Sequence, residues 1–579
     1  MILQALYEYY ERKAADPESN VPPEGWEWKE IPYLVAVNKE GSFAGINNSR
    51  EGEGKGKRAR KFLVPQSVKR SVGIKANLLW DNIEYALGAN PRKRKDIGKR
   101  HNAFKERLND ILAVNNIPSV KALQKFLDND PISQIKDSGY ADLWEVMLDE
   151  NPFIAFRIDG EPHSTLCDDI RAIELSSRAP GEKGSGVCLI TGETNVQVAR
   201  LHPDIKGVRG TNAKGAALVA FNLPPFESYN KTQNYNAPIS GRAAFAYTTA
   251  LNILLGKDSQ NKVSLGDVTA VFWTEKPKEN KHSFDLEGQF AWYVTDKKDD
   301  PDRGVQAVRS LYASLRTGTL SASTERFYVL GLAPNVARIS VRFFRQGTVR
   351  DFGQKIKMHF DDFEIVRSPF DPEYLSLFRI LTAVALKYKM ENVPPSLSGS
   401  VVESILDGTP YPATLLQQCV RRVRAERQVT RPRAAILKAC MNRFQRTHKS
   451  SEKEIAVALD SNNTNTGYLL GRLFAVLEKI QEEANPGINA TIRDRFYGAA
   501  STTPVTVFSQ LLKLKNHHLA KLPNPGRKVN FEKLIGDVMS NLSRLPANLT
   551  LNDQAYFAVG YYHQRQDFFT SRKTEPQEH

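Results

Sequence analysis

The hydrophobic period of the chain changes near Asp371, and this change constrains the fold more than any other feature. Before it, short β-rich runs alternate with turns rich in Gly, Pro and Asn; after it, apolar residues recur at helical spacing. The strand-like runs are 153–158, 187–190, 217–221, 268–273, 327–331, 338–344 and 365–366. The pattern predicts an α+β protein whose β-rich, mixed N-terminal region is followed by an α-helical bundle.

The helical part divides further into a basic stretch and a more apolar one. Residues 371–450 read as a basic helical connector, and residues 451–579 carry broad apolar faces separated by Asn-Pro-Gly turns. Short connections between amphipathic helices are typical of an antiparallel bundle. We therefore expect domain boundaries at 370 and 450, with residues 1–370 forming the mixed α/β region.

The charge balance is the clearest functional signal. The 579-residue chain has 80 Lys and Arg against 65 Asp and Glu, which gives a formal net charge of +15. This surplus favours a phosphate-rich partner such as nucleic acid, and more weakly an anionic membrane surface. The sequence shows no apolar run long enough to cross a bilayer and no signal-peptide pattern. We expect a cytoplasmic protein without a membrane partner.

Cations gather in stretches that lack the usual pairing with acids. Residues 50–75 hold nine Lys and Arg against two Glu, residues 411–449 hold ten against one, and residues 91–108 form a further basic cluster. Surface helices normally mix charges at i,i+4 spacing, so missing acids favour an external anion; the alternative is a solvated face. The residues predicted to contact nucleic-acid backbone are Lys57, Arg58, Arg60, Lys61, Lys69, Arg70, Arg421, Arg422 and Arg424.

The loop-rich segment 202–236 differs in kind, because it combines Gly and Asn with basic residues. Amide side chains can pair with base edges, and basic side chains can hold phosphates or enter a minor groove. Glycines at 207, 210 and 215 would let the backbone approach a ligand closely. Asn is also common in turns, so each one alone has an ordinary structural explanation. The residues predicted to read DNA are Lys206, Arg209, Asn212, Lys214, Gln233, Asn234 and Asn236.

The usual catalytic signatures are missing. The sequence has no GxxxxGK[ST] phosphate loop and no HExxH pair, and the adjacent Asp361 and Asp362 are more typical of a solvated edge than of a two-metal site. The cysteines show no CxxC spacing, which predicts reduced, mostly buried thiols. We expect no catalytic residue, no bound metal and no cofactor. The alternatives are a nuclease or RNA-processing enzyme, with His101, His282 or His563 as general base, and a structural scaffold.

Eight segments carry a resemblance that covers nearly the whole chain in order. They are VPQSVKRSVGIKANLLWDNIEYALG, HPDIKGVRG, GAALVAFN, ESYNKTQNYNAPIS, AAFAYTTALNILL, GYLLGRLFAVLEKIQEEA, IRDRFYGAASTTPVTVF and GYYHQRQDFF. Together they resemble the large subunit of the subtype I-C CRISPR surveillance complex, Cascade.

The resemblance implies a non-catalytic subunit at the 5′-handle end of the CRISPR RNA. Such a subunit recognises the protospacer-adjacent motif (PAM) in duplex DNA and promotes R-loop formation in antiviral defence. The implied partners are the CRISPR RNA, target double-stranded DNA, the backbone, handle-binding and small subunits, and a helicase-nuclease recruited on target binding. The C-terminal helical region is expected to resemble the small subunit, which the family also makes by internal translation. We assign PAM recognition to the loop residues above on their chemistry.

Overall fold

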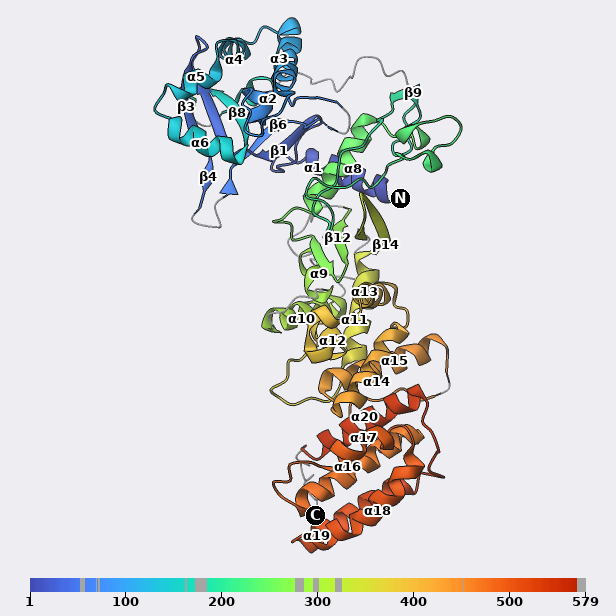
Figure 1. Ribbon diagram of the computed structural model, residues 1–579. Coiled ribbons are helices and arrows are strands. Elements are labelled where there is room, and N and C mark those ends of the chain that lie inside the picture. The colour runs from blue at the N-terminus through green and yellow to red at the C-terminus, as the bar shows by residue number, and fades with distance from the viewer. Residues whose placement is uncertain are drawn as a thin grey trace. The chain divides into compact units, whose positions relative to one another are not determined.

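The computed structural model describes residues 1–52, 58–68, 70, 73–161, 164–171, 185–275, 286–294, 301–317, 325–450 and 452–569. They form two compact units, and each unit combines two stretches of chain. Unit 1 contains Met1–Ile205 and Val219–Ile253, and unit 2 contains Lys206–Leu218 and Leu254–His579. Figure 1 labels many of the elements of each unit. The loop-rich segment predicted to read DNA is therefore divided between the units.

Unit 1 contains a sheet with the strand order β3-β2-β8-β7 in the described part of the chain. β2 (Tyr33–Val37) is buried along its whole length and pairs in parallel with β8 (Phe153–Ile158). β3 (Phe43–Asn48) and β7 (Trp80–Asn82) join the sheet in antiparallel orientation. Strands covered on both faces read as continuous apolar runs, which is how β8 was predicted from the sequence.

Helices form the crossover between β2 and β8. Among them are α2 (Ile83–Ala86), α3 (Ile97–Val114) and α4 (Pro118–Asp128), and α3 and α4 bury Phe104 and Phe126 in the core of the unit. The other elements of the N-terminal part are α1 (Ile2–Ala14), β1 (Trp26–Glu30), β4 (Arg50–Glu51), β5 (Arg58–Ala59), β6 (Lys61–Pro65), α5 (Pro131–Lys136), α6 (Ala141–Glu150), α7 (Leu166–Asp169), β9 (Ser185–Gly186), β10 (Val196–Gln197), the 3-10 helices η2 (Pro224–Phe226) and η3 (Gln233–Asn236), and α8 (Gly241–Leu254).

Unit 2 begins with an antiparallel sheet. In the described residues its strands are, in order, β11 (Lys262–Leu265), β12 (Val268–Thr274), β13 (Arg326–Asn335) and β14 (Arg338–Thr348). A register shift lies between Gly331 and Leu332 of β13. Val341 pairs with Leu332 and Phe343 pairs with Gly331, so the shift turns these two side chains to opposite faces of the sheet, and Phe343 is buried whereas Val341 is exposed.

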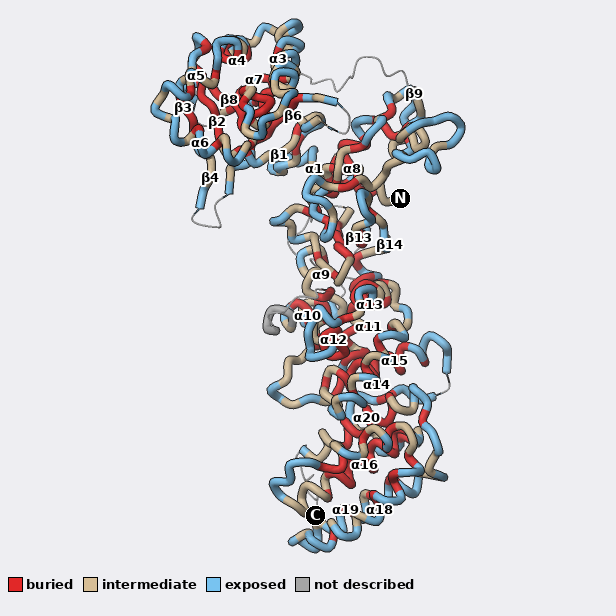
Figure 2. Tube along the Cα trace, viewed as in Figure 1, coloured by how far each residue is buried: buried red, intermediate tan, exposed pale blue. Residues whose placement is uncertain are grey.

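A continuous apolar core runs from this sheet into the C-terminal helices. Figure 2 shows buried segments along the middle of the helical part. The helices are α9 (Leu286–Val294), α10 (Pro301–Arg316), α11 (Val349–Phe363), α12 (Leu377–Ala383), η4 (Leu386–Tyr388), η5 (Met390–Asn392), α13 (Leu397–Asp407), α14 (Ala413–Glu426), α15 (Arg431–Thr447), α16 (Thr466–Ala484), α17 (Ile492–Ala500), α18 (Pro504–Ala520), α19 (Pro525–Met539) and α20 (Leu551–Asp567). The domain boundaries at 370 and 450 stay predictions.

The α+β fold class predicted from the sequence is confirmed. The strands expected at 153–158, 268–273, 327–331 and 338–344 form, whereas 187–190, 217–221 and 365–366 do not become strands. In the first of these, Cys188 N–H bonds to the Glu193 carbonyl, so the backbone folds into a turn. The cysteines are free and buried, as predicted. No described helix has the length and apolar composition needed to span a bilayer.

The helices α16 and α20 cross at a contact too close for a side chain. A Cβ atom on Gly471 would lie 2.0 Å from the Phe557 carbonyl oxygen, and one on Gly560 would lie 2.2 Å from the Tyr468 carbonyl oxygen. Backbone therefore meets backbone at this crossing. Any larger residue would force the helices apart and open the core between them.

Gly471→Ala is expected to lower the free energy of unfolding by about 1–3 kcal/mol, because its methyl group overlaps the Phe557 carbonyl. Gly536→Ala is the matched control, since it makes the same change at an exposed position inside α19. The added Cβ atom there would meet no atom within 4 Å outside the helix's own backbone. There the higher helix propensity of Ala predicts a gain of about 0.5–1 kcal/mol. Denaturant unfolding followed by far-UV circular dichroism measures both variants. Equal effects of the same sign would contradict the close crossing.

Candidate nucleic-acid interface

Two basic clusters that are separate in the sequence meet at the ring of Tyr85 in unit 1. The Arg70 guanidinium lies 4.1 Å from the ring centroid, and that of Arg100 on α3 lies 5.1 Å from it. Tyr85 itself is held in the first turn of α2, where its backbone N–H donates to the capping Asn82 side chain. An aromatic ring attracts cations, so Tyr85 gathers charge from both clusters.

The arginines of α3 and of the loop before it are positioned by a buried carboxylate. Glu84 is 1% exposed, and its carboxylate lies 3.2 Å from Arg94 Nε and 3.6 Å from a terminal nitrogen of Arg100. Arg92 Nε lies 3.9 Å away. A buried carboxylate is costly without a cationic partner, so Glu84 holds these guanidinium groups near Tyr85.

Arg70 is fixed in the same way by Asp81, which is fully buried. The Arg70 guanidinium pairs with the Asp81 carboxylate, and its Nε donates to the Lys75 carbonyl oxygen at 2.7 Å. Asp81 also accepts a hydrogen bond of 2.8 Å from the Asn77 backbone N–H. Burial raises the pKa of Asp81, and the guanidinium of Arg70 opposes this rise.

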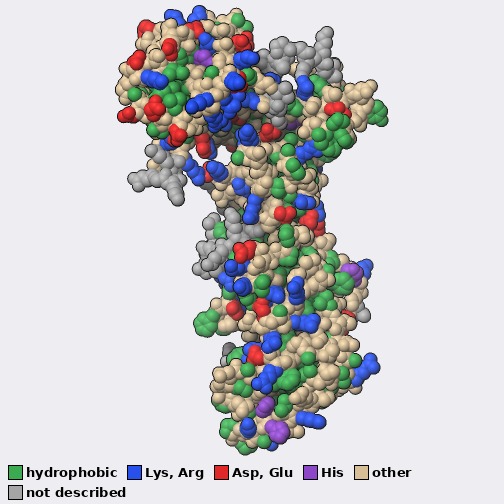
Figure 3. All heavy atoms as spheres, in the orientation of Figure 1, with side chains coloured by type: hydrophobic (Ala, Val, Ile, Leu, Met, Phe, Trp, Pro, Cys, Tyr) green, Lys and Arg blue, Asp and Glu red, His purple; other side chains and the backbone are tan. Residues whose placement is uncertain are grey.

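The cations here outnumber the carboxylates that hold them. Arg92, Lys93, Lys95 and Lys99 are exposed, and Figure 3 shows Lys and Arg side chains gathered over the part of unit 1 that contains α2 and β6. Guanidinium groups suit phosphate oxygens because they donate in a planar fork. We name as the Tyr85 surface the residues Arg70, Tyr85, Arg92, Lys93, Arg94, Lys95, Lys99 and Arg100.

Of the backbone contacts predicted in unit 1, Arg70 belongs to the Tyr85 surface. Arg58, Arg60 and Lys61 are exposed on and between β5 and β6, and Arg60 lies 3.9 Å from Glu51. Lys57 and Lys69 lie outside the described residues. Sequence reasoning did not include Arg92, Arg94 or Arg100 among the contacts. The basic cluster at 91–108 was the available signal, but its spacing does not show which arginines turn toward Glu84.

The contacts predicted on α14 are partly occupied by neighbours. Arg421 and Arg424 are exposed, whereas Arg422 lies 3.5 Å from Glu426 on the next helical turn. Both side chains of this pair are largely buried, at 13% and 27% exposed, and Glu426 also pairs with Arg433 at 2.5 Å, so Arg422 is engaged within the protein. These three contacts stay predictions.

Most cations of α15 face the core of unit 2, whereas Arg446, which also pairs with Asp362, is 39% exposed. Arg443 pairs with the buried Asp362 at 2.6 Å, and Lys438 donates to the Asp362 carbonyl at 3.0 Å. Arg431 and Arg433 are also buried. The expectation that an external anion compensates this basic stretch is therefore wrong for α15. So is the expectation of a solvated edge at Asp362, because the α15 guanidinium groups and this carboxylate neutralise one another inside the protein.

The first group predicted to read DNA lies on an exposed loop of unit 2, comprising Lys206, Arg209, Asn212 and Lys214. The loop is fastened near β12: Arg209 N–H donates to Thr269 Oγ1 at 3.0 Å, and its guanidinium donates to the Gly266 carbonyl at 3.2 Å. A Cβ atom on Gly207 would lie 2.5 Å from the Leu255 carbonyl oxygen. Packing within the protein thus requires Gly207, a reason different from the predicted approach of a ligand.

The second group, Gln233, Asn234 and Asn236, belongs to unit 1. Asn236 Oδ1 accepts from the Ser228 N–H at 2.9 Å, and its Nδ2 donates to the carbonyls of Lys231 at 2.7 Å and Gln233 at 2.9 Å. Asn234 is 1% exposed. In this conformation these two asparagine amides are engaged or enclosed by the loop itself. Their geometry favours a structural role over contact with base edges.

The histidines considered as general bases are held by the fold. His563 is 1% exposed, its Nδ1 lies 2.9 Å from the Tyr468 hydroxyl, and burial lowers its pKa to about 4. His101 Nδ1 lies 3.0 Å from the Tyr85 carbonyl, and burial lowers its pKa. His282 lies outside the described residues. His563 is too deeply enclosed to meet a nucleic-acid strand.

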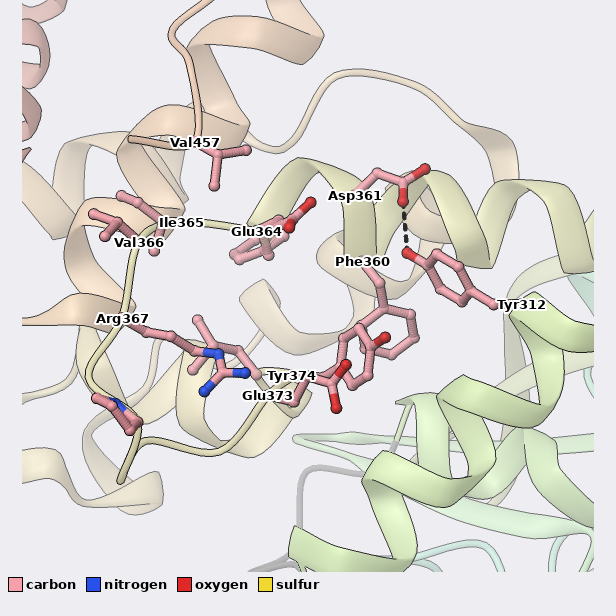
Figure 4. Close-up of a pocket in the computed structure, with 13 residues that line it drawn as sticks. Tyr312, Phe360, Asp361, Glu364, Ile365, Val366, Arg367, Glu373, Tyr374 and Val457 are labelled. Atoms are coloured by element: carbon pink, nitrogen blue, oxygen red, sulfur yellow. Dashed lines mark hydrogen bonds between the residues drawn. The ribbon is translucent and has the colours of Figure 1, made fainter. Parts of the chain in front are cut away.

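A cavity of about 570 Å³ in unit 2 is lined by acidic and aromatic side chains. Figure 4 shows Asp361 and Glu373 beside it, with the Tyr312 hydroxyl donating to Asp361 Oδ1 at 2.5 Å. Lys357 pairs with Asp361 at 2.6 Å, and Arg309 pairs with Glu373 at 2.6 Å. These cations neutralise the carboxylates, and Arg367 also lines the cavity, so its charge is balanced and lacks the surplus of cations that attracts a nucleic-acid backbone. The described residues contain no group of three or more His, Cys, Asp or Glu that could hold a metal ion.

Comparison with known proteins gives a match to a family model described as CRISPR-associated protein (Cas_Csd1). The match spans residues 6–569 and therefore includes both units and the Tyr85 surface. No curated protein matches the chain.

Asn236→Ala is expected to loosen the turn at 228–231, because the variant lacks the hydrogen bonds of the amide. If the bond from Ser228 contributes about 1 kcal/mol, hydrogen exchange at the Ser228 amide should rise roughly fivefold. Asn212→Ala, which removes an amide from the other unit, is the control and should leave this exchange rate unchanged. An unchanged exchange rate in the Asn236 variant would mean that this amide does not brace the turn and is available to pair with a base edge.

Proposed function

This chain belongs to the Cas_Csd1 family of CRISPR-associated proteins, and we propose that it is the non-catalytic large subunit of a subtype I-C surveillance complex. In this role it binds the 5′-handle end of the CRISPR RNA, recognises the PAM in duplex DNA and promotes R-loop formation. Base pairing with the guide then reads the target sequence. Its partners are the backbone, handle-binding and small subunits, and a helicase-nuclease recruited after target binding.

The observation that carries the proposal is the Tyr85 surface. Its arginines are already oriented by Glu84 and Asp81, so their rotamers need little further ordering when a phosphate arrives. Positive charge beyond that needed by the carboxylates remains on the exposed side chains of residues 92–99. Such contacts position nucleic acid without reading its sequence, as a subunit that leaves sequence reading to the guide requires.

We assign PAM reading to the exposed loop 206–214. Asn212 and Lys214 are exposed there, and the Asn212 Oδ1 accepts from the Lys214 backbone N–H at 3.1 Å, which defines the loop conformation. An amide that pairs well with a base edge contributes roughly 1–3 kcal/mol of discrimination. Of Gln233, Asn234 and Asn236, only the half-buried Gln233 is still proposed to contact a base edge.

The proposal of a subunit without turnover rests on the placement of the adjacent carboxylates Asp361 and Asp362, together with that of the histidines described above. Asp362 is neutralised by Arg443 in the core, and Asp361 is paired with Lys357 and hydrogen-bonded to Tyr312. A general base must reach the proton that it removes. Asp362 is enclosed in the core, and Asp361, which lines the cavity, is held by Lys357 and Tyr312, so neither is placed as a free base and this supports a binding role.

The quadruple variant Arg92→Ala, Lys93→Ala, Lys95→Ala and Lys99→Ala is expected to weaken binding of CRISPR RNA and duplex DNA regardless of sequence. For every duplex phosphate that the variant no longer neutralises, the slope of log affinity against log salt should fall by about 0.9. Fluorescence anisotropy across a salt titration measures this slope for the full-length chain.

The matched control removes the same charge from another part of unit 1, through Lys39→Ala, Lys121→Ala, Lys125→Ala and Lys136→Ala, all exposed lysines. It should keep the wild-type slope. Equal reductions in both variants would mean that only net charge matters. Wild-type slopes in both would mean that the exposed cations of the Tyr85 surface form a solvated face.

We expect no cleavage of RNA or DNA by the purified chain with Mg²⁺, Mn²⁺ or Zn²⁺. His101→Ala should leave any background cleavage at the wild-type level, because His101 bonds to the backbone of α2. Labelled CRISPR RNA and target duplex, resolved on denaturing gels, provide the measurement. Turnover that one point substitution abolishes would contradict the proposal and favour the enzyme alternative.

A further inference from the structure

The loop before η3 ends in a tight turn with an exposed aromatic residue at its tip. Ser228 and Lys231 form an antiparallel bridge, and between them Tyr229 and Asn230 have φ values of 52° and 57°. Two successive residues with positive φ across a two-residue connection are characteristic of a type I′ turn. The Tyr229 side chain is 95% exposed.

Tyrosine is an unfavourable choice for this position. Asn and Gly are preferred at the centre of a type I′ turn, and Asn230 follows that rule. A left-handed conformation costs an ordinary residue about 1–2 kcal/mol. Because the ring is almost fully exposed, its burial within the described protein does not offset that cost. A strained backbone that holds an unburied ring outward favours a contact with something outside the chain.

The turn is also braced. The Asn236 side chain accepts from the Ser228 N–H and donates to the Lys231 carbonyl, which fixes both ends of the turn. Farther along, the Gln233 N–H donates to Glu227 Oε1 at 3.2 Å. The position of the Tyr229 backbone is therefore defined before any partner binds, which reduces the entropic cost of binding.

We propose that Tyr229 stacks on an unpaired nucleobase next to a duplex, with the exposed Lys231 contacting a neighbouring phosphate. The inference rests on the proposed function and adds a contact for a base. The flat ring of Tyr229 can stack on one base, and the cation of Lys231, two residues away, can contact a phosphate of the same strand. Stacking of a base on an aromatic side chain contributes roughly 1–3 kcal/mol and tolerates any base. An aromatic anchor for a protein partner is the alternative that the experiment distinguishes.

The test uses the full-length chain and a forked DNA whose first unpaired position carries the fluorescent base 2-aminopurine. Tyr229→Asn removes the ring and places a residue that the turn prefers, so the loop should become more stable. Tyr229→Phe keeps the ring. We expect wild type and Tyr229→Phe to quench the probe. Tyr229→Asn should not quench it and should bind the fork about 5- to 150-fold more weakly, as removal of one stacked base implies.

Two controls define the outcome. Phe370→Asn removes a ring that is 98% exposed in unit 2 and should leave fork binding and quenching at the wild-type level. A duplex closed at both ends, which has no unpaired base, should bind wild type and Tyr229→Asn equally.

Each remaining result overturns the stacking contact. Wild-type fork affinity in Tyr229→Asn would exclude it while leaving the proposed function intact. Unchanged fork binding together with failed assembly onto the other subunits would make the ring a protein anchor. Failure of the wild-type chain to bind any nucleic acid would remove the proposed function along with it.

Discussion

The pairing of buried carboxylates with arginine determines which of the chain's many cations remain available to a ligand. A carboxylate removed from water needs a guanidinium or ammonium partner, and breaking such a pair costs about 3–5 kcal/mol. In unit 1 the buried Glu84 gathers arginines whose side chains stay open to solvent: Arg94 is 36% exposed and Arg92 59%. In unit 2 the buried Asp362 takes Arg443, whose side chain is 2% exposed. The same interaction builds a surface in one unit and a core in the other.

This difference explains why the charge pattern of the sequence was misleading for α15. Residues 411–449 have almost no acids of their own, so their sequence favoured an external anion. The compensating carboxylate, Asp362, lies on α11 and meets α15 only through packing. Local spacing cannot reveal such a partner. The fold class was more accessible, because buried strands such as β8 and β12 and the long apolar helix faces are local patterns that tertiary packing preserves.

The candidate site was predictable in composition but not in geometry. The basic clusters at 50–75 and 91–108 are plain in the sequence, whereas their meeting at Tyr85 depends on the short helix α2, which reads as an ordinary apolar segment. Amides and glycines were harder to interpret, since the same residue types read bases and build turns. Asn236 braces a turn, and Gly207 accommodates the Leu255 carbonyl. Hydrogen-bond partners decide between these roles, and residue type alone does not.

In the proposed role, the chain must find a short motif in a large excess of DNA, and such a search benefits from contacts that are weak individually and fixed in advance. Carboxylates that orient arginines also cancel part of their attraction for phosphate, so the Tyr85 surface exchanges some affinity for defined geometry. The strained turn at Tyr229 follows the same logic, because backbone energy is spent in the free protein to hold a side chain outward. Under the same proposal, rigid phosphate contacts set the register of the nucleic acid, because only in a fixed register could the loop 206–214 discriminate one base step from the next.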